Sequence, residues 1–515
     1  MSDIVTLNGY KIKDEKAVRS YENVAQMKAD TKLKEGYHVK TKGYYEANDG
    51  GHGEYVIVND DTLVDDGGSI HVLTSGLRAK LIIENDTINS IQFGCKRNDD
   101  TFDNGVKFNT LFNKANEKGL NVIIQNGNYY VSTPIIINEK LYAITIDGLN
   151  PSSNLNGTKL IYTGDGYCLT LAKGGLKYTI KNIAIECNGN NSGINCNGVI
   201  NTVINFKNYL TNISVSSAII GMKIVASTYT MIDNYTFGGH ANTEVGLYIE
   251  GYEFTYINNS SIDGYSLTDS NSIALKLDGG LNYYINNLDL CNFGDGKAIY
   301  MTNDNFNLYT VYYNNINVIR CDGGIVTECG TRGAINSISF DNTLIALTGT
   351  KATAKYFYSI PNSSSIMYFD IRNLTIRNLA QTTLPDYIYE QASGGIFSLL
   401  LEIKDLYFCP ISKSGIKGGT TDRYTYKNYT TRNQGMKYIN TDGTTTQYTL
   451  SLDWANQSNK PFINIYVRGH NDYTLSDPSY NTTTGKLETT ITFSTAPSQG
   501  NIRVAYTISD CGAGS

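Results

Sequence analysis

The sequence predicts an all-β protein built around a parallel β-helix, with a small head before the helix and an antiparallel β-sandwich after it. Two columns of short apolar strands that share one period predict the helix. A change to alternating apolar and polar residues near the end predicts the sandwich. The 515 residues are 41% hydrophobic and 17% charged, which supplies enough apolar material for a large core and excludes global disorder.

The first column is a short segment in which Asn precedes an apolar-x-apolar triplet. Consecutive copies lie 22 to 30 residues apart, and they begin at Asn182, Asn212, Asn234, Asn259, Asn287 and Asn315, with weaker copies at Asn373 and Asp405. Each triplet is expected to be a short strand with one face inward. The Asn that opens it is expected to be a turn residue whose amide bonds along the helix axis.

The second column interleaves with the first. Its strands begin at Gly221, Gly246, Ala274, Ala298 and Gly324, in steps of 24 to 28 residues. Leucine-rich repeats have a similar period, but they need Leu-rich inward positions and an Asn after the strand, whereas here the Asn precedes it. A β-helix with about three strands per turn explains both columns, and we expect it over residues 91–417.

The regions before and after the helix differ from it in pattern. Residues 1–35 contain a charged, helix-like run with little apolar content, which predicts an attachment segment that orders only on a partner. Residues 36–90 contain a Gly-rich turn and are expected to form a β head. Residues 446–509 alternate apolar and polar side chains between turn clusters, which predicts an antiparallel sandwich over residues 418–515.

Composition excludes several classes of function. The net charge of −6 offers no basic field for a nucleic-acid backbone. No apolar run reaches the length of a membrane-spanning helix, and no secretion signal is visible at the start. The nine cysteines are odd in number and contain no C-x-x-C pair, so free thiols from a reducing cytosol are expected. We expect no metal and no cofactor.

The outward positions of the second column supply candidate catalytic residues. If its apolar residues point inward, Glu250 and Asp278 point outward in one ladder on adjacent rungs, and Asp304 follows on the next rung. Glycoside hydrolysis needs two such carboxyl groups. We therefore expect Glu250, Asp278 and Asp304 to be catalytic. The alternative is a solvated acidic face without chemistry. The residues expected to contact sugar are Tyr248, Tyr252, Lys276 and Tyr300.

A second set of carboxylates lies near the Asn column. It consists of Asp263, Asp289 and Asp295, and it is the next candidate for the catalytic groups. The competing interpretation is that these side chains cap turns through hydrogen bonds to nearby backbone amides.

Residues 91–137 carry a resemblance to a known family. They contain, in order, Phe93-Gly94, an acidic loop, a helix expected at 104–118, a strand at 122–124 and Gly127-Asn128-Tyr129. This order resembles the start of the right-handed, pectate-lyase-like parallel β-helix of phage tailspikes. The family usually has Gly-Asp-Gly after Phe-Gly, where this chain has residues 96–99 instead. The Gly-rich run at 43–55 and the strands after 446 are similar to the head and terminal sandwich of phage tail proteins.

The resemblance implies a function that composition alone does not. It implies a homotrimeric tailspike of the virion, attached to the phage tail or baseplate through its N-terminus. Such a protein is made in the host cytoplasm and acts at the bacterial surface, where it recognises a polysaccharide and is expected to cleave its glycosidic bonds. We expect hydrolysis; elimination, for which Lys276 beside Glu250 and Asp278 could serve, is the alternative. One alternative is a receptor-binding fibre without catalysis on the same scaffold. Another is a cellular pectate-lyase-like enzyme, which would leave the head and sandwich unexplained and predicts a secretion signal.

Overall fold

The computed structural model describes residues 5–509, apart from 8–9, 13–17, 138–142, 151–156, 173–176, 189–195, 202–206, 226, 252, 266, 305–306, 331–334, 348–354, 361–365, 379–388, 392–395, 408–415, 418–422, 427–432, 453–461, 468–472, 477–478, 485 and 499. The chain divides into two compact units, residues 1–256 and 257–515. Each unit is described by itself below.

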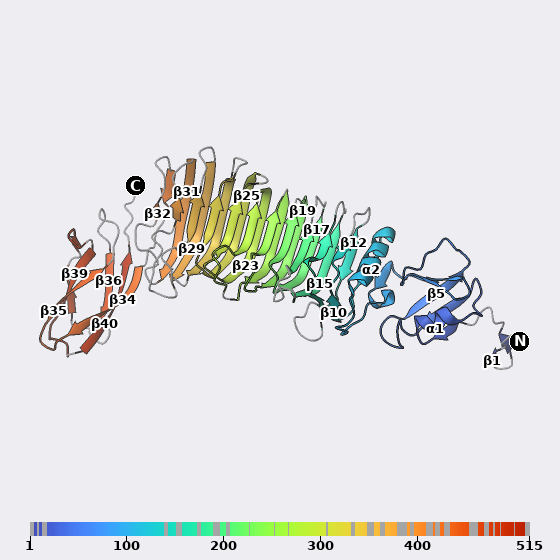
Figure 1. The fold of residues 1–515 in the computed structure, drawn as a ribbon. Coiled ribbons are helices and arrows are strands. Elements are labelled where there is room, and N and C mark those ends of the chain that lie inside the picture. The colour runs from blue at the N-terminus through green and yellow to red at the C-terminus, as the bar shows by residue number, and fades with distance from the viewer. Residues whose placement is uncertain are drawn as a thin grey trace. The chain divides into compact units, whose positions relative to one another are not determined.

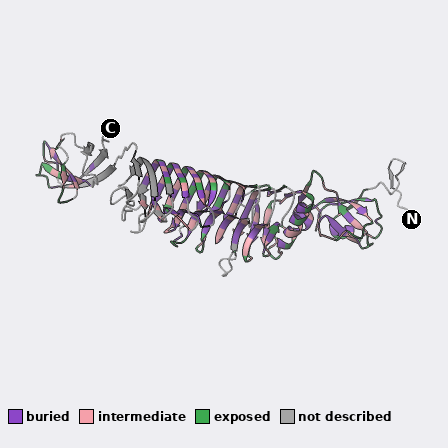
Figure 2. Ribbon diagram, turned by 90° about the horizontal axis from the view of Figure 1, so that it is seen from above, coloured by how far each residue is buried: buried purple, intermediate pink, exposed green. Residues whose placement is uncertain are grey.

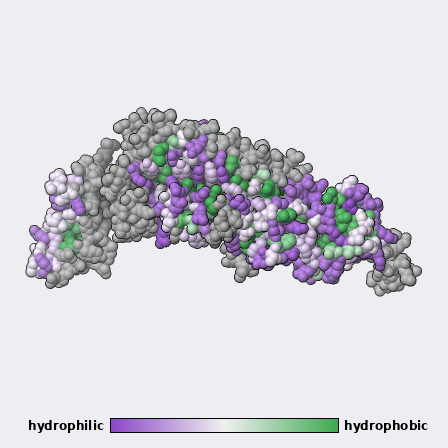
Figure 3. Space-filling model, in the orientation of Figure 1, coloured by the Kyte–Doolittle hydropathy of each residue, from purple (hydrophilic) through white to green (hydrophobic). Residues whose placement is uncertain are grey.

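The described residues are mainly β-strands, as Figure 1 shows, so the predicted all-β class is confirmed. Helical structure among them is confined to α1 (Val24–Ala29), α2 (Gly105–Lys118) and the 3-10 turn η2 (Ile91–Phe93). Neither α-helix is long and apolar enough to cross a bilayer. On the face in Figure 3, hydrophobic residues form separate small patches among hydrophilic ones.

The first unit begins with a short antiparallel pair and a small domain. The pair is β1 (Val5–Leu7) and β2 (Tyr10–Ile12). The domain is a five-stranded sheet in the order β3-β4-β5-β7-β6, and its strands are β3 (Arg19–Tyr21), β4 (His38–Thr41), β5 (Gly53–Val58), β6 (Ile70–Val72) and β7 (Arg78–Leu81). Strand β5 alternates buried and half-buried residues, as expected for a strand with one face on a core.

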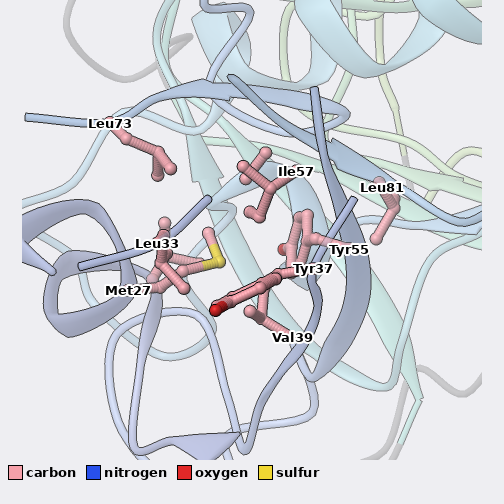
Figure 4. Close-up of a cluster of buried hydrophobic side chains, with 10 residues drawn as sticks. Met27, Leu33, Tyr37, Val39, Tyr55, Ile57, Leu73 and Leu81 are labelled. Carbon is pink, nitrogen blue, oxygen red and sulfur yellow. The ribbon is translucent and has the colours of Figure 1, made fainter. Parts of the chain in front are cut away.

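The core of this domain corrects one predicted boundary. Figure 4 shows Met27 and Leu33 facing Tyr37, Val39 and Ile57, and Val24 belongs to the same buried cluster. The expectation that residues up to 35 stand outside a folded core is therefore wrong for residues 19–35. Val24 and Met27 lie three residues apart on the buried side of α1, and Leu33 follows in the segment after it. These apolar residues are few among the charged ones of this run, so the sequence did not reveal the core.

The helix expected at 104–118 is confirmed as α2. Phe108 and Phe112 stack on its buried face, and the ring of Tyr129 meets Phe108 edge-on at 5.4 Å. Gly119 ends the helix in the left-handed conformation that favours glycine. The Phe93-Gly94 pair ends the η2 turn rather than a strand, because Gly94 is also left-handed and turns the chain there.

The β-helix strands of the first unit pair in parallel. One sheet contains β8 (Thr87–Asn89), β9 (Asn121–Ile123), β10 (Gly127–Val131), β12 (Ile144–Asp147), β13 (Thr158–Tyr162), β15 (Tyr178–Cys187), β17 (Asn208–Ser216) and β19 (Tyr229–Gly238). The other contains β11 (Ile135–Ile137), β14 (Gly166–Leu171), β16 (Cys196–Asn201), β18 (Ile220–Val225) and β20 (Val245–Glu250). The first half of β15 pairs with β12 and its second half with β13, so each turn has three strand segments.

The second unit continues the same pattern. Its long strands are β23 (Gly280–Gly294), β25 (Leu308–Cys321), β27 (Ile335–Leu347), β29 (Ile366–Asn378) and β31 (Ile396–Tyr407), and the four-residue β33 (Arg423–Tyr426) pairs with β31. Its short strands are β22 (Ile273–Asp278), β24 (Lys297–Thr302), β26 (Ile325–Glu328), β28 (Phe357–Ile360), β30 (Tyr389–Gln391) and β32 (Ile416–Lys417). Strand β21 (Phe254–Asp263) contains the division between the units. Figure 2 shows buried residues in stripes across those strands of the helix whose burial is described.

The repeated Asn bends a long strand rather than opening a short one. In β25, Val311 and Tyr313 are buried before Asn315, and Ile316 and Val318 are buried after it, so the inward positions change phase at the Asn. Asn315 has φ of 56°, in the left-handed region that Asn tolerates better than other non-glycine residues. The same conformation occurs at Asn182, Asn212, Asn234, Asn259, Asn287, Asn342 and Asn373.

The amides of these bends bond to one another along the axis, as predicted. Asn315 Nδ2 donates to Asn287 Oδ1 at 2.8 Å, and Asn287 Nδ2 donates to Asn259 Oδ1 at 2.9 Å. Asn234 donates in the same way to Asn212 at 2.7 Å. The ladder therefore satisfies polar side chains at a corner that every turn of the helix must make.

Substitution of Asn287 tests the two contributions of this ladder. Alanine at φ of 53° is strained by about 1–2 kcal/mol and loses both amide bonds, so we expect Asn287→Ala to lower the free energy of unfolding by about 2 kcal/mol or more. Asn287→Gly relieves the strain and loses only the bonds, so it should cost about 1 kcal/mol less. Urea unfolding midpoints of both variants would measure this, and equal losses would contradict the strain argument.

The C-terminal part of the second unit is antiparallel, as predicted. One set is β34 (Asn433–Thr441), β36 (Phe462–Val467) and β40 (Gly500–Ser509), and the other is β35 (Gln447–Leu452), β37 (Tyr473–Leu475), β38 (Ser479–Asn481) and β39 (Lys486–Phe493). A buried cluster joins Val504 of the first set to Leu450, Leu487 and Phe493 of the second.

Candidate functional site

A group of carboxylates gathers where three short strands of the second unit end. Asp278 ends β22, Thr302 ends β24 and Glu328 ends β26, and the parallel register places them opposite one another in that order. Neighbouring strands lie about 4.8 Å apart, so Asp278 and Glu328 are two rungs, roughly 10 Å, apart at the backbone. Asp304 follows the middle rung by two residues. The sequence predicted Asp278 and Asp304 here.

The three carboxylates differ in their exposure. Asp304 is exposed, and its Oδ2 accepts a hydrogen bond from Thr302 Oγ1 at 3.0 Å. Glu328 is half-buried. Asp278 is only 2% exposed, although its position in the strand alternation is outward. The expected open position of Asp278 is therefore wrong, because the chain turns directly after it at Gly279 and Gly280, both of which have positive φ.

Tyr300 lies on the outward face of β24 and contacts the carboxylate group through Glu328. Its hydroxyl donates to Glu328 Oε2 at 2.7 Å. Burial raises the pKa of Tyr300, and the hydrogen bond to Glu328 and the nearby charges of Glu328, Asp304 and Asp278 raise it further. Tyr300 is therefore a protonated donor at neutral pH, and it fixes the direction of the Glu328 carboxylate.

Sequence reasoning missed Glu328, although a signal for it was present. The second column was followed only to Gly324-Ile325-Val326-Thr327, one residue short of this side chain. In register, Glu328 occupies the rung after Thr302, and Thr302 occupies the rung after Asp278. Extending each strand of the column by one position would have placed Glu328 in the ladder.

Lysines lie beside the aromatic rings of this face. Lys276 is opposite Tyr300, with its Nζ 6.0 Å from the ring centre, and Lys297 Nζ lies 5.6 Å from the same ring. Farther along the ladder, Lys355 Nζ lies 5.4 Å from the ring of Tyr358. The ladder runs Lys276, Tyr300, Val326, Tyr358, Glu390. Its two half-buried tyrosines are thus two rungs apart.

The first unit holds a similar but separate group. Lys223 Nζ lies 3.8 Å from the Glu250 carboxylate and 4.6 Å from the ring centre of Tyr248. Glu250 and Asp278 belong to different units, so their predicted pairing stays a prediction. Tyr252 lies outside the described residues.

The second predicted set has turn and ladder contacts. Asp263 Oδ1 accepts from the backbone N–H of Tyr265 at 2.7 Å, which is the predicted turn-capping bond. Asp289 Oδ1 accepts from Asn317 Nδ2 at 2.7 Å on the next rung. The pKa of Cys291 is raised to about 12 by burial and by its negative neighbours Asp263 and Asp289. Asp295 lies in the turn between β23 and β24, so the three do not form one ladder.

The carboxyl groups of Asp278, Asp304 and Glu328 can take up and release protons. Among the described residues, no three His, Cys, Asp or Glu side chains are arranged to hold a metal ion. Asp278 and Glu328 lie two rungs apart, with Thr302 on the rung between them. Such pairs suit proton transfer to and from an oxygen.

Comparison with known proteins gives one match at the level of sequence families. Residues 20–84 match the family described as the phage tail protein small four-stranded beta-sheet domain. This range is the small domain of the first unit. The predicted resemblance to phage tail proteins is confirmed for this domain. A search of curated proteins found no significant match.

Solved structures with a similar fold include several tailspikes. The enzymatically active domain of tailspike protein 4 of bacteriophage CBA120 is 12% identical, with a TM-score of 0.49, covering 96% of this chain and 75% of that one. The gp42 tailspike of Acinetobacter phage vb_AbaP_AS12 is 10% identical, with a TM-score of 0.44 and 94% of each chain covered. The glycan biofilm modifying enzyme WceF of Pantoea stewartii is 11% identical, with a TM-score of 0.39, and the match covers 98% of this chain and 76% of that one.

Proposed function

We propose that this chain is a phage tailspike that binds a bacterial surface polysaccharide and cleaves its glycosidic bonds by hydrolysis. The observation that carries the proposal is that Asp278 and Glu328 end two strands of one sheet, while Asp304 follows the end of the strand between them, beside Tyr300. The match of residues 20–84 to a phage tail domain supports attachment of this end to the phage tail or baseplate. The virion tail would then be its location, and the host surface its place of action.

The carboxylate spacing bears on the stereochemistry of cleavage. Retaining enzymes hold their two carboxyl groups about 5 Å apart, and inverting enzymes about 6.5–9.5 Å apart to admit a water. Asp278 and Glu328 lie two rungs apart, roughly 10 Å at the backbone, which is nearer the second arrangement. In either case one carboxyl group donates a proton to the leaving oxygen while the other acts as base or nucleophile.

The glycan would lie along the helix axis. Tyr300 and Tyr358 are two rungs apart on one ladder, roughly 10 Å, and each has a lysine beside its ring. Flat rings at regular intervals suit a linear chain of sugars, whose faces pack on aromatic side chains while the hydroxyls bond to Lys and Glu. Tyr358 is a contact that the sequence did not predict.

Non-catalytic receptor binding is the second candidate. The burial of Asp278 favours it, since a carboxyl group closed off from solvent cannot meet a polymer directly. The deciding experiment is incubation of the protein with purified capsule or wall glycan of a susceptible host. New reducing ends without unsaturated sugars support hydrolysis, unsaturated ends indicate elimination, and binding without fragments supports the receptor-binding function.

We also propose that three copies assemble side by side. A solenoid of this kind exposes apolar side chains along its strands, among them Leu281 at 39% and Tyr368 at 52%, and packing against copies covers such positions. Light scattering at micromolar concentration should then give three times the chain mass of 56.8 kDa. A mass of one chain at every concentration tested would contradict the trimer.

A further inference from the structure

We propose that Gly330 and Asn303 position the Asp304 carboxylate for catalysis. The inference rests on the proposed function, because it assigns a role in that same site. Asp304 is the exposed carboxyl group of the three and follows the end of β24. An exposed side chain after a strand end has several rotamers available, so something else must restrict it if it is to work in a fixed geometry.

The segment after β26 supplies that restriction. Asn303 is fully buried, and its Oδ1 accepts the backbone N–H of Gly330 at 2.5 Å. This bond ties the residue before Asp304 to the next turn of the helix. Thr302, also buried, holds the carboxylate from the other side through its hydroxyl. Asp304 is therefore held between its own strand and the neighbouring one.

The glycine at 330 is required for space rather than for backbone conformation. Its φ does not lie in the left-handed region, so an L-residue meets no strain there. A Cβ at this position would instead lie 2.0 Å from Asp304 Oδ1 and 2.8 Å from its Cγ. Gly330 thus forms a wall against which the carboxylate packs, and any side chain displaces that carboxylate.

A double-mutant cycle tests the proposal. Gly330→Ala should lower kcat by at least about tenfold with little change in KM, because a carboxylate displaced by an ångström no longer meets the reacting atoms. In an Asp304→Ala background, the same Gly330→Ala change should have no further effect on the residual rate. Asn303→Ala, which removes the acceptor for the Gly330 N–H, should follow the same pattern.

The matched control is Gly198→Ala in the first unit. A Cβ there would meet the backbone oxygen of Gly221 at 2.2 Å, a clash of similar distance that involves none of the three carboxylates. It should lower stability without lowering kcat. If Gly330→Ala slows the Asp304→Ala enzyme as much as the wild type, Gly330 acts through general stability and the proposal fails.

A crystal structure of Gly330→Ala separates this inference from the proposed function. If the wild type cleaves no glycan, the proposed function fails, but the position of the Asp304 side chain is still measurable. Displacement of that carboxylate from Thr302 supports the positioning role. A carboxylate that keeps its 3.0 Å bond to Thr302 in the variant overturns it.

Discussion

Replacing Glu328 with Gln or Asp304 with Asn is expected to lower glycan turnover by about a hundredfold or more, while glycan binding persists. Each change keeps the shape of the side chain and removes a group that can carry or accept a proton, and such groups contribute about 10²–10⁴-fold. Gln at 328 still accepts the Tyr300 hydrogen bond through its carbonyl oxygen. Reducing-end release under saturating glycan, with binding measured separately, gives the result.

Two further variants serve as a control and as a test of Glu250. Glu186→Gln is the control, because Glu186 pairs with Lys159 in another sheet, in the first unit, and should keep full turnover. Glu250→Gln tests the pairing that the sequence predicted, and a large loss there would make Glu250 a member of the site. If Glu328→Gln and Asp304→Asn both match the wild type, the site lies elsewhere and Asp263, Asp289 and Asp295 are next to be tested.

Asp278 is a poorer probe than the sequence suggested. An outward, solvated carboxylate can be changed to an amide at a cost below about 1 kcal/mol. At 2% exposure, however, Asp278→Asn replaces a buried acceptor with a group that is half donor, and we expect a loss of about 1–3 kcal/mol of stability. A loss of activity in that variant would mix folding with chemistry.

The sequence predicted those parts of the fold in which buried apolar residues recur at regular spacing along the chain. The inward positions of β20, β22 and β24 must be apolar, so their spacing appears in the sequence directly. The helix α2 was predicted on another ground, the resemblance of residues 91–137 to the start of a tailspike β-helix. The Asn column was found as a repeat, but its bend was not, because a left-handed dihedral in mid-strand leaves no signal other than the Asn itself.

The candidate site was only partly predictable, because the sequence shows which side chains point outward but not which of them other parts of the chain bury. Strand alternation gives the direction of Asp278 but not its burial, which depends on the path of the chain after Gly279. Glu328 depends on where β26 ends. Gly330 and Asp304 are 26 positions apart in the chain, and they come together only when the two turns are stacked.

The small domain is expected to lose stability as the pH falls from about 6.5 to about 4, because of His71. This side chain is 1% exposed, between the rings of Tyr55 at 5.5 Å and Tyr44 at 6.1 Å, and its Nε2 has no hydrogen-bond partner. Burial lowers the pKa of His71 to about 4 from its usual 6.5. The imidazole is therefore neutral in the folded domain at neutral pH.

The charges around His71 only partly offset its burial. Asp65 lies 3.8 Å from its Nδ1 and favours protonation, but Lys28 bonds to that Asp65 at 2.7 Å and opposes it. Asp66 favours protonation and Lys107 opposes it. The pKa values of Asp65 and Asp66 are themselves lowered, so their losses of stability occur in more acidic solution, below about 4.

The sign of the effect follows from proton uptake. Between pH 6.5 and 4 the unfolded chain binds a proton at His71 and the folded domain does not, so acid favours unfolding in this window. The loss in the free energy of unfolding reaches roughly 3 kcal/mol at pH 4, and the domain keeps nearly all of its stability above pH 6.5.

His71→Phe keeps an aromatic ring between Tyr44 and Tyr55 and cannot titrate, so it should remove this dependence. Hydrogen exchange of amides in residues 19–84 at several pH values, corrected for intrinsic rates, measures it locally. His52→Gln, at an exposed position, should leave the wild-type dependence unchanged. A His71→Phe domain that still weakens between pH 6.5 and 4 as the wild type does would assign the effect to other groups.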